Sequence, residues 1–197
     1  MKTYRAPLLL VVLLSFLTNC SESSDQNYLQ IMNENVVFVD DDQSSYETGD
    51  YLWFNMDIST IQTEIRSEKT IDIFNLTEAK ETFFGFSIYQ VNGEEHSPLE
   101  FNRTAFLIDN GRLNVRSNDD LSSTDLLGVA FFEDGIYKMR VGIPLEDSGQ
   151  YFIANSGLGS GDQGLTFNPT NGSDIQIDFT TKIRSSGDDG RFYFEVN

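Results

Sequence analysis

Few residue types in this chain could carry nucleophilic or metal-based chemistry. The sequence holds one histidine, His96, and one cysteine, Cys20. A Ser-His-Asp triad would have to use His96, and no Gly-x-Ser-x-Gly motif supplies its nucleophile. A zinc site needs several His or Cys ligands. We therefore expect His96 to be a solvated residue in a turn at 92–98, and we predict no zinc site and no catalytic residue.

Carboxylates are plentiful, with 31 Asp and Glu in the chain. A pair of carboxylates could hydrolyse a glycosidic bond. With so many acidic residues, however, some pair will always lie at a suitable distance, so the sequence nominates none. Solvated surface charge is the general interpretation, and we expect a protein that is not an enzyme.

Calcium is the metal that suits an acidic chain, because it prefers oxygen ligands. None of the oxygen-rich segments has the Asp-x-Asp-x-Asp-Gly spacing followed by a distant Glu. One glycine-rich segment faintly resembles the Gly-x-Gly-x-Asp turns of β-roll repeats, but it occurs once and such turns need stacked copies. The sequence thus predicts no cofactor, with calcium as an alternative at four segments: Asp40-Asp41-Asp42, Asn118-Asp119-Asp120 with Asp125, Gly157–Asp162 and Gly187–Gly190.

Aromatic residues offer a different kind of site. In the run Tyr51-Leu52-Trp53-Phe54, both faces of a strand would be aromatic or apolar. If one face is exposed, Tyr51 and Trp53 form a platform on which a sugar ring can stack. The alternative is that both side chains belong to the core.

The N-terminus has the plan of a secretory signal. Lys2 and Arg5 precede an apolar run at 6–17, which is shorter than the roughly 20 residues of a membrane-spanning helix. The run ends at Leu17-Thr18-Asn19-Cys20, with no Ala-x-Ala-like site.

Leu-x-x-Cys directly after a short apolar run resembles the lipobox of bacterial lipoproteins. The resemblance implies that residues 1–19 are removed and that Cys20 is acylated, anchoring the protein in the cell envelope. The implied location is the outer membrane, facing the periplasm or the cell surface. Asn19 departs from the commoner Gly or Ala, and Ser21–Asp25 resembles the acidic export tags of Bacteroidota-type surface lipoproteins. The alternative is a signal anchor with a chance cysteine, but acylation would account for a single thiol that has no disulfide partner.

Charge limits the partners. Thirteen Lys and Arg against 31 Asp and Glu give a formal charge of −18, and loss of Lys2 and Arg5 with the leader makes it more negative. Such a surface repels nucleic acid and anionic membrane. It is compatible with divalent cations, neutral sugars or a basic partner protein. It could also serve only to keep an exported protein soluble.

The rest of the chain predicts mainly strands. Residues 20–35 are polar and predict a flexible tether, followed by one domain at 36–197. Ser59–Lys69 is the best helix candidate, with one turn or two. Strands are expected at 36–39, 51–58, 70–75, 82–91, 106–109, 112–115, 129–133, 136–143, 151–154, 175–183 and 191–196.

Three turn signals organise these strands. Asn110-Gly111 predicts a hairpin that pairs Ile108 with Leu113, and Asp134-Gly135 predicts another. Asp189-Gly190 precedes the last strand. Many short strands without intervening helices indicate an all-β fold, an antiparallel sandwich or a barrel.

One segment favours a particular sandwich. Leu145–Ile153 (LEDSGQYFI) resembles the Asp-x-Gly-x-Tyr corner of immunoglobulin-like domains, which implies that the Tyr151 hydroxyl bonds back to the backbone. Ile153 stands where that family has a cysteine, and Trp53 lies too far upstream for the usual spacing. Another sandwich, a jelly roll or a barrel stays open.

From these observations we expect a lipid-anchored envelope protein that binds a glycan or a protein partner without catalysis. The alternatives are a carboxylate-based glycan hydrolase and a structural subunit of an envelope assembly. The ligand-binding residues are not identified by the sequence.

Overall fold

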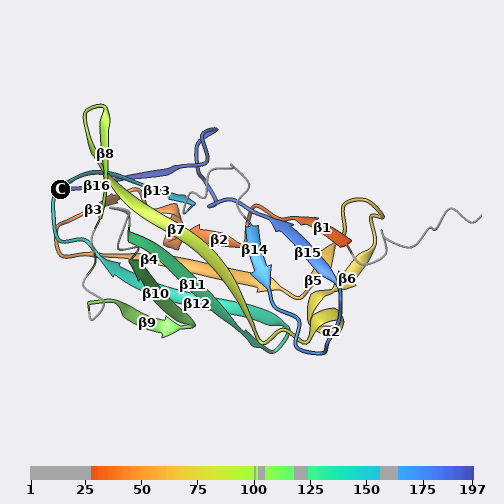
Figure 1. Ribbon diagram of the computed structural model, residues 1–197. Helices are drawn as coiled ribbons and strands as arrows, with labels where there is room; N and C mark the ends of the chain where they lie inside the picture. The colour runs from red at the N-terminus through yellow and green to blue at the C-terminus, as the bar shows by residue number, and fades with distance from the viewer. Residues whose placement is uncertain (1–27, 100, 102–104, 118–123, 156–163) are drawn as a thin grey trace, which may run out of the picture.

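The computed structural model describes residues 28–99, 101, 105–117, 124–155 and 164–197 (Figure 1). Nearly all of their regular structure is strand, which confirms the all-β prediction. Fourteen strands form one curled sheet, and β5 and β6 pair separately. The strands of the N-terminal half are β1 (Tyr28–Met32), β2 (Val37–Val39), β3 (Ser45–Tyr46), β4 (Tyr51–Ser59), β5 (Ile61–Thr63), β6 (Thr70–Asp72), β7 (Glu81–Asn92) and β8 (Glu95–Pro98). Those of the C-terminal half are β9 (Leu107–Asn110), β10 (Arg112–Ser117), β11 (Thr124–Glu133), β12 (Ile136–Pro144), β13 (Gly149–Asn155), β14 (Gly164–Phe167), β15 (Gln176–Thr180) and β16 (Phe192–Val196).

The large sheet is mixed. Its main path runs β1-β15-β14-β7-β11-β12-β4-β2, and β13, β16 and β3 extend it from β7. Most pairs are antiparallel, as predicted, but β1 runs parallel to β15 and β3 runs parallel to β16. Because pairing connects all fourteen strands, a two-sheet sandwich and an immunoglobulin-like topology stay predictions.

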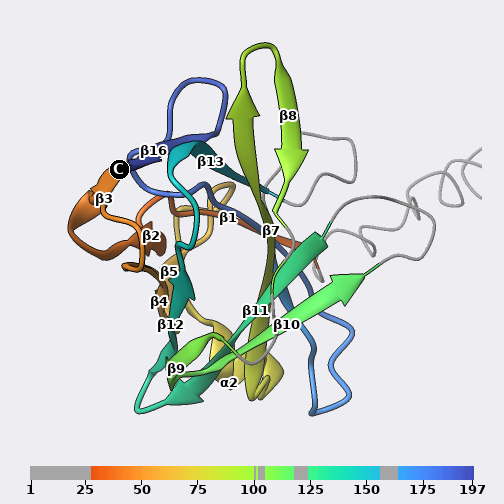
Figure 2. The same ribbon diagram turned by 90° about the vertical axis from the view of Figure 1, so that its left-hand side faces the viewer.

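The hairpin β11–β12 makes the sheet curl. Its turn is the predicted Asp134-Gly135, with positive φ values of 48° and 84°, as a type I′ turn requires. The two strands pair only over Phe131–Glu133 and Ile136–Lys138. Beyond that point β10 takes the place of β12 beside β11, and β9 takes the place of β11 beside β12. The opposite edges of β11 and β12 pair with β7 and β4. Figure 2 shows the result, with β4 and β12 on one side of the molecule and β7 and β11 on the other.

The predicted hairpin at Asn110-Gly111 is wrong. β9 pairs with β12 and β10 pairs with β11, so the chain passes at Gly111 from one strand of the splayed hairpin to the other. Gly111 has the positive φ that the turn signal requires, 76°. A Cβ there would lie 2.5 Å from the Val129 carbonyl oxygen and 2.7 Å from Cγ of Met139. The glycine therefore permits a close crossing of strands instead of closing a hairpin.

Two local predictions between β4 and β7 are also corrected. The helix expected within Ser59–Lys69 is absent, because its residues form β5 and the turn to β6. The strand expected at 70–75 stops at Asp72, whose carboxylate caps the short helix α2 (Ile73–Thr77) by accepting the Asn75 N–H at 3.2 Å.

The sheet also begins earlier than predicted. Residues 28–32, within the range expected to be a tether, form β1 and pair in register with β15. Ile31 is fully buried, and its apolar side chain explains why this segment joins the sheet. The boundary of the folded part therefore lies before residue 36.

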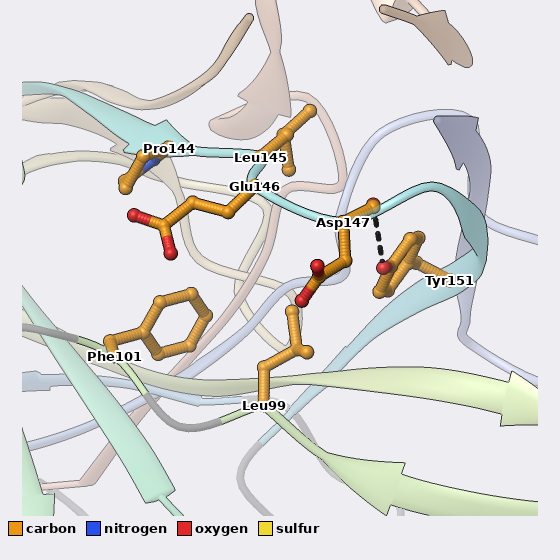
Figure 3. Close-up of a pocket in the computed structure, with 7 residues that line it drawn as sticks. All are labelled: Leu99, Phe101, Pro144, Leu145, Glu146, Asp147 and Tyr151. Atoms are coloured by element: carbon orange, nitrogen blue, oxygen red, sulfur yellow. Dashed lines mark hydrogen bonds between the residues drawn. The ribbon is translucent and has the colours of Figure 1, made fainter. Parts of the chain in front are cut away.

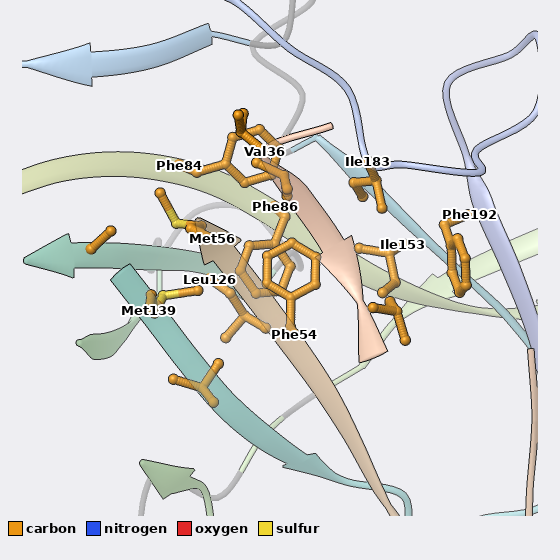
Figure 4. Packing of buried hydrophobic residues seen from close by; sticks show 14 of the residues in the cluster. Val36, Phe54, Met56, Phe84, Phe86, Leu126, Met139, Ile153, Ile183 and Phe192 are labelled. Carbon is orange, nitrogen blue, oxygen red and sulfur yellow. The ribbon is translucent and has the colours of Figure 1, made fainter. Parts of the chain in front are cut away.

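The core fills the space between the two sides of the curled sheet (Figure 4). Phe54 of β4 stacks on Phe86 of β7 with ring centres 4.2 Å apart, and both side chains are fully buried. Met56 of β4 and Met139 of β12 lie beside these two rings and are also buried. Each such aromatic residue contributes about 3–5 kcal/mol when compared with alanine. This contact fixes the inward face of β4, so its alternate residues must face outward.

Candidate functional site

Trp53 lies on the outer face of the sheet. Its neighbours in β4, Leu52 and Phe54, are fully buried, whereas Trp53 is half-buried. Gly142 of β12 stands directly opposite, and a Cβ there would come within 3.3 Å of the indole atoms Cη2 and Cζ2. The structure thus selects the outer-face alternative for Trp53.

Arg140 covers this indole. Its guanidinium carbon lies 3.9 Å from the Trp53 ring centre. Nη2 donates to Asp40 Oδ2 at 2.7 Å, and Nη1 donates to Asp109 Oδ2 at 3.0 Å. Both hydrogen bonds raise the pKa of Arg140 above its usual value, and the bond to Asp40 has the larger effect. The half-buried Trp53 ring is therefore covered by a cation of the protein itself, which leaves less of the ring free for a sugar to stack on.

The acidic run Asp40–Asp42, which forms the 3-10 turn η1, joins two arginines. Asp40 binds Arg140, and Asp42 Oδ1 accepts a hydrogen bond from Nε of Arg184 at 2.9 Å. Arg184 in turn lies over the Phe38 ring, with its guanidinium carbon 4.4 Å from the ring centre. Two carboxylates proposed as calcium ligands thus serve as partners of arginine. Within the described part of the chain, no three His, Cys, Asp or Glu side chains gather closely enough to hold a metal ion.

A groove of about 300 Å³ lies beside this network, on the outer face of the sheet. The volume is at the lower end of the roughly 300–1,000 Å³ of small-molecule sites. Its lining comes from β2, β4, β12 and the end of β9: Phe38, Asn55, Met56, Asp57, Asp109, Asn110, Lys138, Met139 and Arg140.

Asn55 is the most buried polar side chain of the groove, with 5 % of its surface exposed. Its Nδ2 donates to Asp40 Oδ1 at 2.6 Å and to the Trp53 carbonyl oxygen at 3.2 Å, which fixes the orientation of the amide. Its Oδ1 accepts no hydrogen bond from any described residue. Asn55 lines the groove, where this oxygen is available to a ligand.

Asp57 and Lys138 supply charges at the same groove. They stand directly opposite each other on β4 and β12, and neither side chain makes an ion pair within the described residues. With Asn55, the groove therefore offers an ammonium donor, a carboxylate acceptor and an amide acceptor. A ligand whose groups both donate and accept hydrogen bonds, such as a polyol, satisfies this set.

No family model, no curated protein and no solved structure matches this chain. Among the described residues, no helix is long and apolar enough to cross a membrane. The interpretation of the groove therefore depends on its own geometry.

The predicted tyrosine corner is present and lines a second, smaller pocket (Figure 3). The Tyr151 hydroxyl donates to the carbonyl oxygen of Asp147 at 2.8 Å, which confirms the local prediction. Burial, and after it the Asp147 carboxylate, raises the pKa of Tyr151. The pocket, of about 60 Å³, also contacts Leu99 and Glu146. Its size suits water molecules.

The other predicted site residues lie apart. Cys20, residues 118–120 and residues 157–162 fall outside the described residues. Asp125 Oδ1 accepts a hydrogen bond from the Ser87 hydroxyl at 2.7 Å, and Asp189 binds the Tyr193 hydroxyl. His96 is in strand β8 instead of a turn, and although exposed it packs edge-on against Phe152, with ring centres 5.1 Å apart. Asp125, Asp189 and His96 do not line the groove.

Asn55, Asp109 and Arg140 were missed by the sequence analysis. They are far apart in the chain, and their types carry no signal for each other. One signal was present at Gly142, because a glycine inside an alternating strand indicates close approach of another group. That group is the Trp53 indole.

Proposed function

We propose that this protein is a non-catalytic binding module of a bacterial cell envelope, and that it recognises a neutral glycan in the groove beside Trp53. It is anchored by a lipid on Cys20 in the outer membrane and faces the periplasm or the cell surface. The observation that carries the proposal is Asn55, an almost fully buried amide that lines the groove and whose oxygen accepts no hydrogen bond from the described residues.

The surrounding chemistry supports a neutral, hydroxyl-rich ligand. Sugar hydroxyls can accept from Lys138 and donate to Asp57 and to Asn55 Oδ1 in one pose. The carboxylates of the groove and the overall charge of −18 oppose a polyanion. The groove volume limits the bound part to about one or two sugar units, so the specificity would lie at a terminus or a single exposed unit of a longer glycan.

The test combines a glycan array with titration of the full chain. Trp53 is the only tryptophan, so its fluorescence reports directly on this face. We expect at least one neutral glycan to bind and to change the Trp53 emission. Lys138→Ala and Asp57→Ala should each weaken that binding about tenfold, the value of one charge-assisted hydrogen bond.

Lys69→Ala is the matched control, since Lys69 is exposed and lies outside the groove. It should leave the affinity within about twofold. Absence of any neutral-glycan binding, or binding that ignores Lys138→Ala and Asp57→Ala, would contradict the proposal.

The two alternative functions, a glycan hydrolase and a structural subunit, predict different experimental results. A carboxylate-based hydrolase would release reducing sugar from the bound glycan, which the same titration samples can be assayed for. A structural subunit would use exposed apolar surface, and Leu107 and Ile108 of β9 are 42 % and 50 % exposed. Self-association that Ile108→Lys abolishes, measured by analytical ultracentrifugation, would favour the subunit over the glycan-binding module.

A further inference from the structure

A second outer face carries a row of rings across four neighbouring strands. Tyr193 of β16 pairs with Phe152 of β13, Phe152 pairs with Tyr89 of β7, and Tyr89 pairs with Pro98 of β8. These strands lie together at the upper end of the molecule in Figure 2. We call Tyr193, Phe152, Tyr89 and Pro98 the aromatic row. It is separate from the groove, which lies on β2, β4, β9 and β12.

Phe152 is the centre of this row, and it is buried without belonging to the core. Only 3 % of its surface is exposed, yet it is not part of the main apolar cluster. Its ring stacks on Tyr89 at 5.0 Å between centres and contacts Tyr193 at 5.6 Å. The guanidinium carbon of Arg191 lies 4.6 Å from its centre. The rings that cover Phe152 thus form a small aromatic layer outside the sheet.

Tyr193 is both exposed and fixed. Its side chain is 49 % exposed, while its hydroxyl donates to Asp189 Oδ2 at 2.8 Å and accepts from Arg191 Nη1 at 3.4 Å. The Asp189 Oδ1 also accepts the Arg191 N–H at 3.1 Å, which closes the turn before β16. A fixed ring loses little conformational entropy on binding. Tyrosine and arginine are also enriched, with tryptophan, among the residues that dominate binding at protein interfaces.

Charge indicates the partner. Glu195 follows on the same face of β16, Glu94 and Glu95 lie at the β7–β8 turn, and Asp188 is exposed beside Asp189. Tyrosine faces attract ammonium and guanidinium groups, and Arg191 over Phe152 shows that this layer accepts such a group. Acidic residues around exposed rings therefore complement lysine or arginine side chains.

We infer that the aromatic row is the docking surface for a partner protein that presents lysine or arginine side chains. The inference is independent of glycan binding, because the two faces share no residue. A cation from the partner lies over Tyr193 or Tyr89, and the surrounding carboxylates steer it there.

The test uses an array of short peptides that contain Lys or Arg, beside a matched set in which Gln replaces each basic residue. Binding of the full chain is measured for the wild type and for Tyr193→Ala. We expect a subset of basic peptides to bind, their Gln counterparts to fail, and Tyr193→Ala to weaken binding at least about tenfold. Tyr193→Phe should keep most of the affinity because it keeps the ring.

Tyr28→Ala is the matched control, since Tyr28 also pairs its hydroxyl with an aspartate and lies beside an arginine, but on another strand. Its hydroxyl donates to Asp178 Oδ2 at 2.8 Å, and the Arg66 guanidinium carbon lies 5.4 Å from its ring centre. We expect Tyr28→Ala to change binding less than twofold, with circular dichroism matching that of the wild type for all variants. Equal losses for Tyr193→Ala and Tyr28→Ala would overturn the inference, since general acidity would then explain the binding. Binding of glycans instead of basic peptides at Tyr193 would overturn it as well.

Discussion

Arg140 and Trp53 form a cation–π pair on the outer face of the sheet, with the guanidinium carbon 3.9 Å from the ring centre. Two carboxylates, of Asp40 and Asp109, hold the arginine in place. The pair and its two carboxylates therefore link four elements, η1, β4, β9 and β12. It also places the only tryptophan where any rearrangement of the groove changes its surroundings.

Replacing this arginine should have two effects. Arg140→Ala exposes the Trp53 ring and leaves Asp40 and Asp109 without their shared cation. We expect Trp53 emission to shift to longer wavelength and the free energy of unfolding to fall by about 1–2 kcal/mol. Arg184→Ala is the control, because it uncovers Phe38 in the same way without touching Trp53. An equal emission shift in both variants would contradict the pairing.

Gly111 should tolerate no side chain. Gly111→Ala combines the strain of a positive φ with overlap against Val129 and Met139, and we expect a loss of about 3 kcal/mol. Gly93 has a similar φ of 68° and open space around it. Gly93→Ala should therefore cost only about 1 kcal/mol. Urea unfolding of both variants measures the difference, and similar losses would argue against the strand crossing.

The tyrosine corner should contribute through one hydrogen bond. Tyr151→Phe removes the hydroxyl that donates to the Asp147 carbonyl oxygen and leaves the buried ring in place. We expect a loss of about 1 kcal/mol. Tyr28→Phe removes an exposed hydroxyl–carboxylate bond and should cost well under half of that. Thermal unfolding of the two variants provides the comparison, and an unchanged Tyr151→Phe would remove the corner's structural role.

Acid stability should depend on Glu64. Its carboxylate accepts hydrogen bonds from Ser67, and also from the backbone N–H groups of Arg66 and Gln30, which lower its pKa from the usual 4.5 to about 2. Because the pKa in the folded state lies below that of the unfolded chain, the stabilisation is complete above about pH 4.5 and is lost as the pH falls towards 2. Glu64→Gln should flatten the pH dependence of stability in this window. Parallel curves for the two proteins from pH 2 to 6 would refute this role.

Much of the local structure follows from alternation and turn chemistry. The strand at 191–196 was predicted from sequence, and its alternation accounts for the outward Tyr193 and Glu195 between buried Phe192, Phe194 and Val196. The Asp134-Gly135 hairpin was predicted as well. Asn110-Gly111 shows where this reasoning stops. The pair identifies a backbone that needs a positive φ, but the strands on either side choose partners through tertiary packing.

The candidate site could be predicted only in part. Trp53 and its outward alternative came from the β4 pattern. Arg140 and Asp109 come from elsewhere in the chain. The contact of Arg140 with Trp53 and its ion pair with Asp109 depend on β12 lying between β4 and β9. The same holds for the aromatic row, whose members meet only through strand register.

The parallel pairs β1–β15 and β3–β16 join the earliest segments of the folded chain to the last ones. A ribosome that has not yet made residues 176–196 leaves the opening strands without their native neighbours. Contacts this distant in sequence also slow folding once the chain is whole. We therefore expect the sheet to close in a late, slow step. In a chain shortened before β15, we expect β1 and β3 to be unpaired, because their partners β15 and β16 are missing.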